Sequence, residues 1–191
     1  MEGKNTGAVV FTLLFIMFCA VIGSCFMAFI YPTKQIKVDN PKLIRDSGIS
    51  VKNEGGEELN ELSLSTLKTG LKPVTGEEDD EYEIPITVTD KQGSEGLYSK
   101  FYLTSDSAWS LYITNIQISS ESNASVERKH IKVGLKDVSE SSQTLEGDKV
   151  KIASGEVLTE PKEFTFYVWL HASAGSSLVG STISFDLSFE H

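Results

Sequence analysis

A continuous apolar stretch, residues 7–31, constrains this chain more than any other feature. It contains no charged residue, no proline and no residue with a side-chain amide. A helix over it is about 37 Å long at about 1.5 Å per residue, and the hydrocarbon core of a bilayer is about 30 Å thick. The stretch therefore predicts a single transmembrane helix or signal anchor that follows a short leader, residues 1–6. Pro32 ends it, because proline lacks the N–H that a helix needs.

Two other interpretations of this stretch stay open. It can be a signal peptide that is removed, although it is long for one and lacks a good small-x-small cleavage pattern. It can also be a lipoprotein signal, because Ile22-Gly23-Ser24-Cys25 looks like a lipobox. Cys25 would then be lipidated and become the new N-terminus, although the residues after it stay apolar.

The orientation of the segment is argued from charge and position. Lys4 precedes the apolar stretch, whereas several basic residues follow it closely, which on a literal count favours a cytoplasmic C-terminal domain. However, long domains cross the membrane largely regardless of charge, and a span at the extreme N-terminus behaves as a secretion signal. We expect a single-pass protein of the cell membrane with an extracellular C-terminal domain, in contact with lipid through its helix.

Charge and cysteine content exclude several classes. The formal net charge is −10, and it arises after the apolar stretch because Glu2 and Lys4 cancel. An acidic domain lacks the clustered Lys and Arg that bind phosphate, so no nucleic-acid partner is expected. Both cysteines, Cys19 and Cys25, lie inside the apolar stretch, so the rest of the chain has neither a disulfide framework nor a thiolate metal site.

Hydrophobic patterning predicts a mainly β protein after the membrane segment. Residues 32–81 are a mixed juxtamembrane region, with short strands expected near 35–38 and 48–51 and an ambiguous leucine spacing that also fits a helix. Residues 82–191 show several short alternating segments, typical of an antiparallel β-sandwich of the jelly-roll or immunoglobulin type. The first strands of that sandwich can come from residues 35–72.

The individual strands follow from period-two alternation. The last two are the clearest, and a phase change near Asn115 predicts a β-bulge. Val150 and Ile152 predict a short strand that residues 156–158 can extend. The expected inward-facing residues of the clearest strands are Phe164, Phe166, Val168 and Leu170, then Ile183, Phe185, Leu187 and Phe189.

Groups that could carry chemistry are few. His130, His171 and His191 are far apart in the sequence, and no cysteine can complete a zinc site, so neither a metal nor a cofactor is expected. The acidic residues 77–83 lack the spacing of a calcium loop and predict a solvated loop before a strand. A Ser–His–Asp triad is compatible with the composition, but the chain has no G-x-S-x-G elbow. We therefore expect a protein that is not an enzyme.

Two further motifs have competing interpretations. Asn123-Ala124-Ser125 matches the glycosylation acceptor pattern and also reads as an ordinary turn, which we favour. Tyr167 and Trp169 share the strand face opposite Phe164 and could form an aromatic ligand platform, although such residues more often cover the outer face of a sheet.

The C-terminal sequence FTFYVWLHASAGSSLVGSTISFDLSFE resembles the closing strands of bacterial surface proteins of the TasA/camelysin type. That resemblance implies a jelly-roll-like sandwich behind an N-terminal signal, able to assemble into extracellular fibres. The metal-ligand pattern of the camelysin proteases is not recognisable, so no activity is carried over. The leader with Lys4 and Gly7 also resembles pilin-like signals, but it lacks the glutamate that bacterial pilins carry early in the helix.

These features together predict a membrane-anchored extracellular β-sandwich with a structural role in cell-surface or matrix assembly. Its partners would be membrane lipid and further copies of itself or other surface proteins. The alternatives are a pilin-like filament subunit and a surface module that binds a ligand such as a glycan.

Overall fold

The computed structural model describes residues 36–65, 96–120, 128–136, 138, 143–171, 174 and 180–191. The predicted membrane segment with Cys25, the acidic residues 77–83 and the motif at Asn123 lie outside the described residues. No helix among the described residues is long and apolar enough to cross a membrane. The chain divides into two units, Met1–Lys34 and Gln35–His191, and the described residues all belong to the second.

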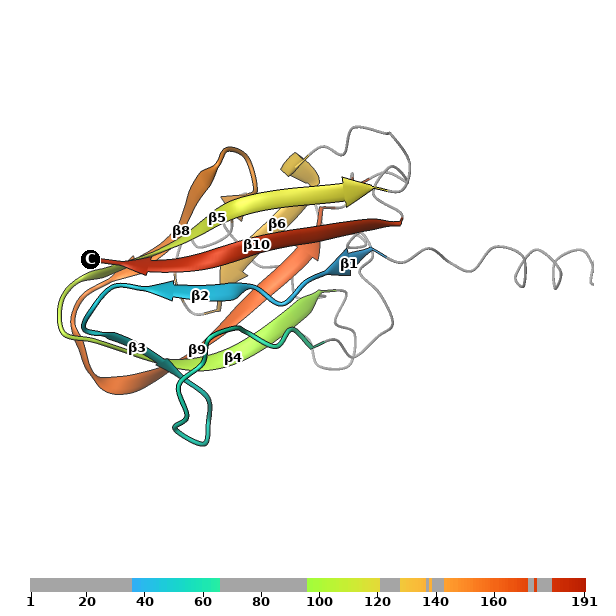
Figure 1. Cartoon of the computed structure of the whole chain (residues 1–191). Helices are drawn as coiled ribbons and strands as arrows, with labels where there is room; N and C mark the ends of the chain where they lie inside the picture. The colour runs from blue at the N-terminus through green and yellow to red at the C-terminus, as the bar shows by residue number, and fades with distance from the viewer. Residues whose placement is uncertain are drawn as a thin grey trace, which may run out of the picture. The chain divides into compact units, whose positions relative to one another are not determined.

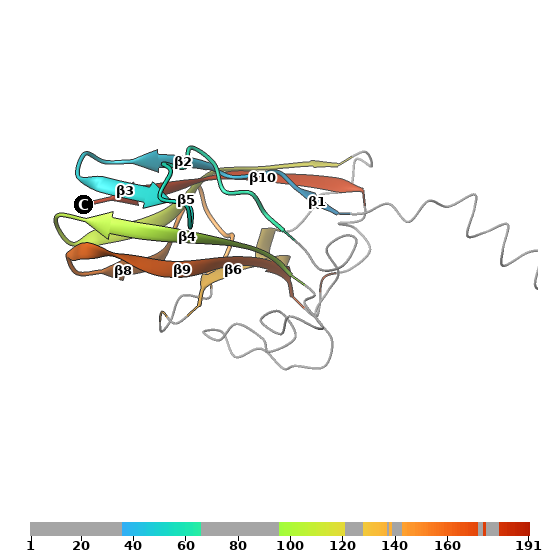
Figure 2. The same ribbon diagram turned by 90° about the horizontal axis from the view of Figure 1, so that it is seen from below.

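Two packed β-sheets make up the described part of the second unit, which confirms the sandwich-like fold (Figure 1). One sheet has the strand order β1-β10-β5-β8, with β2 also paired to β10, and the other has the order β3-β4-β9-β6-β7. Figure 2 shows the two layers from the side. The strands are β1 (Lys37–Val38), β2 (Lys42–Arg45), β3 (Ile49–Lys52), β4 (Leu97–Ser105), β5 (Trp109–Ser120), β6 (Ile131–Leu135), β7 (Gln143–Thr144), β8 (Lys149–Gly155), β9 (Leu158–Leu170) and β10 (Ser181–Glu190), and the 3-10 helix η1 (Arg128–His130) precedes β6.

The expectation of a purely antiparallel sandwich is wrong at one edge. Both β1 and β2 run parallel to β10, with Val38 opposite Ile183 and Leu43 opposite Leu187. Parallel neighbours need a long connection between them, and here the rest of the domain supplies it, because these are its first and last strands. The described sandwich thus begins before residue 82 and includes the two strands expected near 35–38 and 48–51.

Residues 57–65 cover the edges of β2 and β3. The segment forms isolated bridges to β2, to β3 and to β4, at Glu61, Glu58 and Ser65 respectively. Leu62 anchors the segment in the core, with none of its surface exposed. Exposed sheet edges invite pairing with other chains, so this segment protects the edges of β2 and β3. The sequence left the segment ambiguous because its leucines follow an irregular path across both sheets.

The predicted bulge is present. Asn115 has a φ of 54°, and the register between β5 and β10 shifts between Ser184 and Asp186. The Asn115 amide donates a hydrogen bond of 2.7 Å to the Asp186 carboxylate. The extra residue reverses the side-chain phase, so that Ile113 and Ile116 both face the core.

The core lies between the sheets and contains the faces predicted for β9 and β10. All eight of those inward-facing apolar residues are buried. Aromatic rings join the sheets, with Phe166 edge-on to Phe185 at 6.1 Å and Phe101 edge-on to Phe189 at 5.8 Å between ring centroids. The extension of β8 over residues 156–158 is wrong, because β8 ends at Gly155 and Leu158 already begins β9 in the opposite sheet.

Candidate functional site

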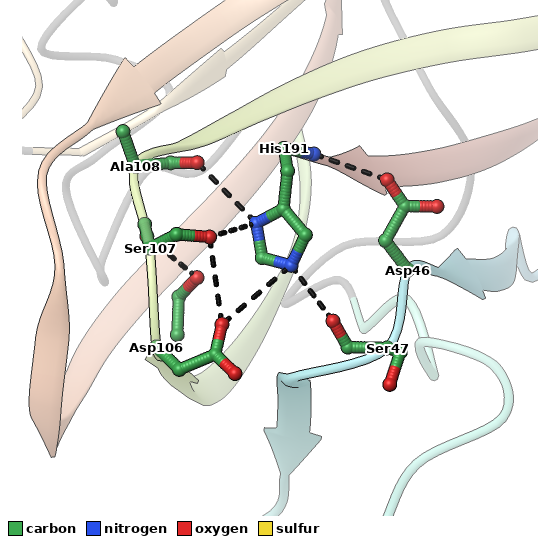
Figure 3. Close-up of polar contacts among 7 residues, drawn as sticks. Asp46, Ser47, Asp106, Ser107, Ala108 and His191 are labelled. Atoms are coloured by element: carbon green, nitrogen blue, oxygen red, sulfur yellow. Dashed lines mark hydrogen bonds and ion pairs between the residues drawn. The ribbon is translucent and has the colours of Figure 1, made fainter.

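Three chain segments meet around His191 at one end of the sandwich (Figure 3). They are the β2–β3 turn, the β4–β5 turn and the residue that follows β10. We call this cluster, Asp46, Ser47, Asp106, Ser107 and His191, the His191 clasp. It lies at the end of the domain opposite the start of β1 (Figure 1).

Backbone hydrogen bonds join the β2–β3 turn both to β10 and to the β4–β5 turn. Asp46 N–H donates to the Phe189 carbonyl at 3.0 Å, and Asp106 N–H donates to the Gly48 carbonyl at 3.3 Å. Gly48 has a φ of 90°, and a Cβ at this position would lie 2.3 Å from the Asp106 carboxylate. Only glycine fits both the left-handed backbone and this close approach.

The His191 imidazole connects both turns through its two ring nitrogens. Nε2 lies 2.7 Å from the Ser47 carbonyl oxygen, and Nδ1 lies 2.6 Å from Ser107 Oγ. A carbonyl oxygen only accepts, so Nε2 carries the proton of the neutral ring and Nδ1 accepts from the Ser107 hydroxyl. The His191 backbone N–H also donates to the Asp46 carboxylate at 3.1 Å.

The surroundings of the ring favour its protonated form. The Ser47 carbonyl is the main cause that raises the pKa of His191 above its usual value. The Ala108 carbonyl, 3.4 Å from Nδ1, and the nearby Asp106 and Asp46 carboxylates act in the same direction, while partial burial opposes them. An imidazolium ring has two N–H donors and can satisfy both carbonyls.

The clasp contains the residue types of a serine nucleophile and its base, but their arrangement differs from that of a triad. In a triad the base is held by a carboxylate on the nitrogen opposite the serine. Here a backbone carbonyl takes that place at 2.7 Å, while the Asp106 carboxylate is 3.7 Å from Nε2. What this geometry supports directly is a proton-dependent link between the end of β10 and two turns.

The other predicted site residues lie elsewhere. Tyr167 and Trp169 form a small cluster with Tyr98 on the outer face of the β9 sheet. The exposed fraction is 7% for Tyr167 and 2% for Trp169. An open aromatic platform needs exposed rings, and this burial leaves little ring surface for a ligand.

The structure brings together two histidines that are distant in the sequence. His130 ends η1 directly before β6, and His171 directly follows β9. Their ring centroids are 6.3 Å apart, and His171 N–H donates to the His130 carbonyl. These two histidines are therefore neighbours in the structure although they are far apart in the sequence. The described residues contain no group of three or more metal-ligating side chains placed to hold an ion.

Sequence reasoning missed the clasp. Ser105-Asp106-Ser107 and Asp46-Ser47-Gly48 both have the composition of a turn. Nothing in the sequence indicates that both turns meet His191, which is separated from Ser47 by 144 positions. That contact exists because β10 lies beside β2 and because β3 and β4 pair in the opposite sheet.

No protein-family model and no curated protein matches this chain.

Proposed function

We propose that this chain is a membrane-anchored, extracellular β-sandwich protein with a structural role in cell-surface or matrix assembly. The observation that carries the proposal is the place where the apolar stretch joins the domain. Residues 32–36 separate that stretch from β1, and β1 pairs directly with the last strand, β10. In sequence, only five residues therefore separate the predicted anchor from the first strand of the domain.

The sheet edges support a subunit that does not pair indiscriminately with its neighbours on a crowded surface. Residues 57–65 cover the edges of β2 and β3. On the other side, the edge strand β8 presents the exposed lysines Lys149 and Lys151. Charged side chains on an edge strand hinder uncontrolled pairing, which a protein confined to one plane has to avoid.

Within the sandwich class we propose a jelly-roll-like arrangement. The chain crosses repeatedly from one sheet to the other, at β2–β3, β4–β5, β5–β6, β7–β8, β8–β9 and β9–β10. This path and the neighbouring first and last strands support the type of fold that the TasA/camelysin resemblance implies.

Assembly by strand addition makes a specific prediction about β1. In the structure Lys37 of β1 lies opposite Thr182 of β10 in the same chain. A copy that donates its first strand to a neighbour would form the same pair between two chains, because the vacated edge of β10 is identical in every copy.

A cross-linking experiment tests the proposed assembly. Two differently tagged full-length copies, one with Lys37→Cys and the other with Thr182→Cys, are expressed together at native level and oxidised. A disulfide between the two tags supports assembly through β1. A control chain that carries both substitutions should cross-link within itself whenever β1 stays in its own sheet. Cross-links in the control alone would contradict strand donation.

Sequencing of the mature N-terminus separates the proposal from its alternatives. An intact leader is expected for an anchored protein. Loss of residues through Gly7 would instead indicate pilin-type processing, and a blocked N-terminus at Cys25 would indicate a lipoprotein.

A further inference from the structure

A pocket of about 400 Å³ opens between the two sheets beside the β8–β9 connection. Its lining includes Trp109 at the start of β5, residues 154–157 at the end of β8, and Lys162 and Phe164 of β9. Pockets that bind small ligands usually measure about 300 to 1,000 Å³. Trp109 directly follows the β4–β5 turn of the His191 clasp, so the pocket lies at the same end of the domain.

The deep wall of the pocket is aromatic and contains an unused hydrogen-bond donor. Trp109 and Phe164 are each 3% exposed and pack edge to face, with ring centroids 5.5 Å apart. The Trp109 Nε1–H is buried and has no hydrogen-bond partner among the residues that the structure describes. Most buried polar groups are hydrogen-bonded, and an unpaired donor costs about 1 to 3 kcal/mol, so this N–H is a site where an acceptor is favoured.

Gly155 covers that donor. A Cβ at Gly155 would lie 2.8 Å from Trp109 Nε1, so the strand end packs directly on the indole edge. Gly155 is the last residue of β8, so an acceptor atom reaches the N–H only if this strand end shifts outward.

The rim combines apolar surface with charge. Val157 is 48% exposed, one of two large apolar side chains that the described residues expose to this extent. The Lys162 ammonium lies 5.2 Å from the centroid of the Phe164 ring, at the aromatic wall, and the exposed Glu156 lies in the β8–β9 connection. The Lys162 ammonium can pair with one carboxylate, while the Glu156 carboxylate repels any further negative charge on the ligand.

We propose that this pocket binds a monocarboxylate with a branched apolar body, such as an acylated apolar amino acid or the C-terminal residue of a peptide. The carboxylate pairs with Lys162, one of its oxygens accepts from Trp109 Nε1, and the apolar body covers Val157 and Phe164. This site is independent of the membrane role proposed above.

The indole N–H of Trp109 provides a direct reporter of binding. The chain has two tryptophans, and Trp169 lies in the separate cluster on the outer face of the β9 sheet, so its indole resonance is an internal reference. The full-length, 15N-labelled chain in lipid nanodiscs is titrated with N-acetyl-leucine, and Trp109→Phe assigns the resonance. We expect the Trp109 resonance to move saturably and the Trp169 resonance to stay.

Matched ligands and variants test the roles of the charge. N-acetyl-leucinamide, which lacks the carboxylate, should bind more weakly than the acid. Lys162→Gln should weaken acid binding about three- to fivefold, the effect of losing an exposed ion pair, while Lys151→Gln on β8 should leave it unchanged. A leucine-terminated peptide that binds more tightly than the free acid identifies a chain terminus as the ligand, and one that binds less tightly identifies a free small acid.

Three results would overturn the proposal. The first is that the Trp109 resonance does not move up to about 10 mM acid, the range of very weak ligands. The second is that both indole resonances move equally. The third is that the acid and the amide bind with equal affinity.

Discussion

Replacing Phe185 by alanine tests the core that joins the two sheets. Phe185 lies in β10, which has neighbours on both sides, and its side chain is 3% exposed and packs edge-on against Phe166 of the opposite sheet. Truncating a buried phenylalanine costs about 3 to 5 kcal/mol, because burial is lost and a cavity remains. For a domain of this size that corresponds to a fall in melting temperature of about 6 to 20 °C.

The matched control is the neighbouring residue. Ser184 points to the opposite face of β10 and is partly exposed, so Ser184→Ala should change the free energy of unfolding by less than about 0.5 kcal/mol. Urea unfolding of the wild type and both variants, followed by far-UV circular dichroism, measures the difference. A double-mutant cycle with Phe166→Ala should give a coupling of about 0.5 kcal/mol or more between the two rings. Equal losses for Phe185→Ala and Ser184→Ala would refute the assigned faces.

Further predictions concern the clasp and the bulge. The raised pKa of His191 means that its contribution to stability is complete below the usual pKa of about 6.5 and is lost as the pH rises through the raised value. The wild type should therefore lose more stability than His191→Gln between about pH 5.5 and pH 8, and parallel pH curves from thermal unfolding would contradict this. Gly48→Ala should destabilise the fold by about 1 to 3 kcal/mol, because the new Cβ meets Asp106 at a positive φ; an unchanged melting temperature would count against that turn. Asn115→Val should cost about 1 to 3 kcal/mol more than Asn115→Gly in chemical unfolding, since both lose the amide but only valine resists a positive φ.

Local pattern predicted which strand faces pack in the core. Period-two alternation placed the inward side of β9 and β10 correctly, and the phase change at Asn115 located the bulge. These predictions are correct because a strand that packs one face against the core has apolar residues at every second position.

Features that depend on topology could not be predicted from local pattern. The parallel pairing of β1 and β2 with β10 joins the two ends of the domain, and no short-range signal specifies it. The same holds for Leu62, which is fully buried in an irregular segment. The His191 clasp combines both difficulties, because its residues come from turns that only the strand order brings together.

Surface labelling of a single cysteine tests the central claim most directly. The natural cysteines, Cys19 and Cys25, both lie in the apolar stretch, whereas Lys151 is an exposed residue of β8. The full-length Lys151→Cys protein is expressed in its native cells and treated with a membrane-impermeant maleimide before or after lysis, with the wild type as the control for background. An extracellular domain predicts equal labelling of Cys at this position in intact and lysed cells. Labelling only after lysis would place the domain inside the cell and contradict the proposed role at the cell surface.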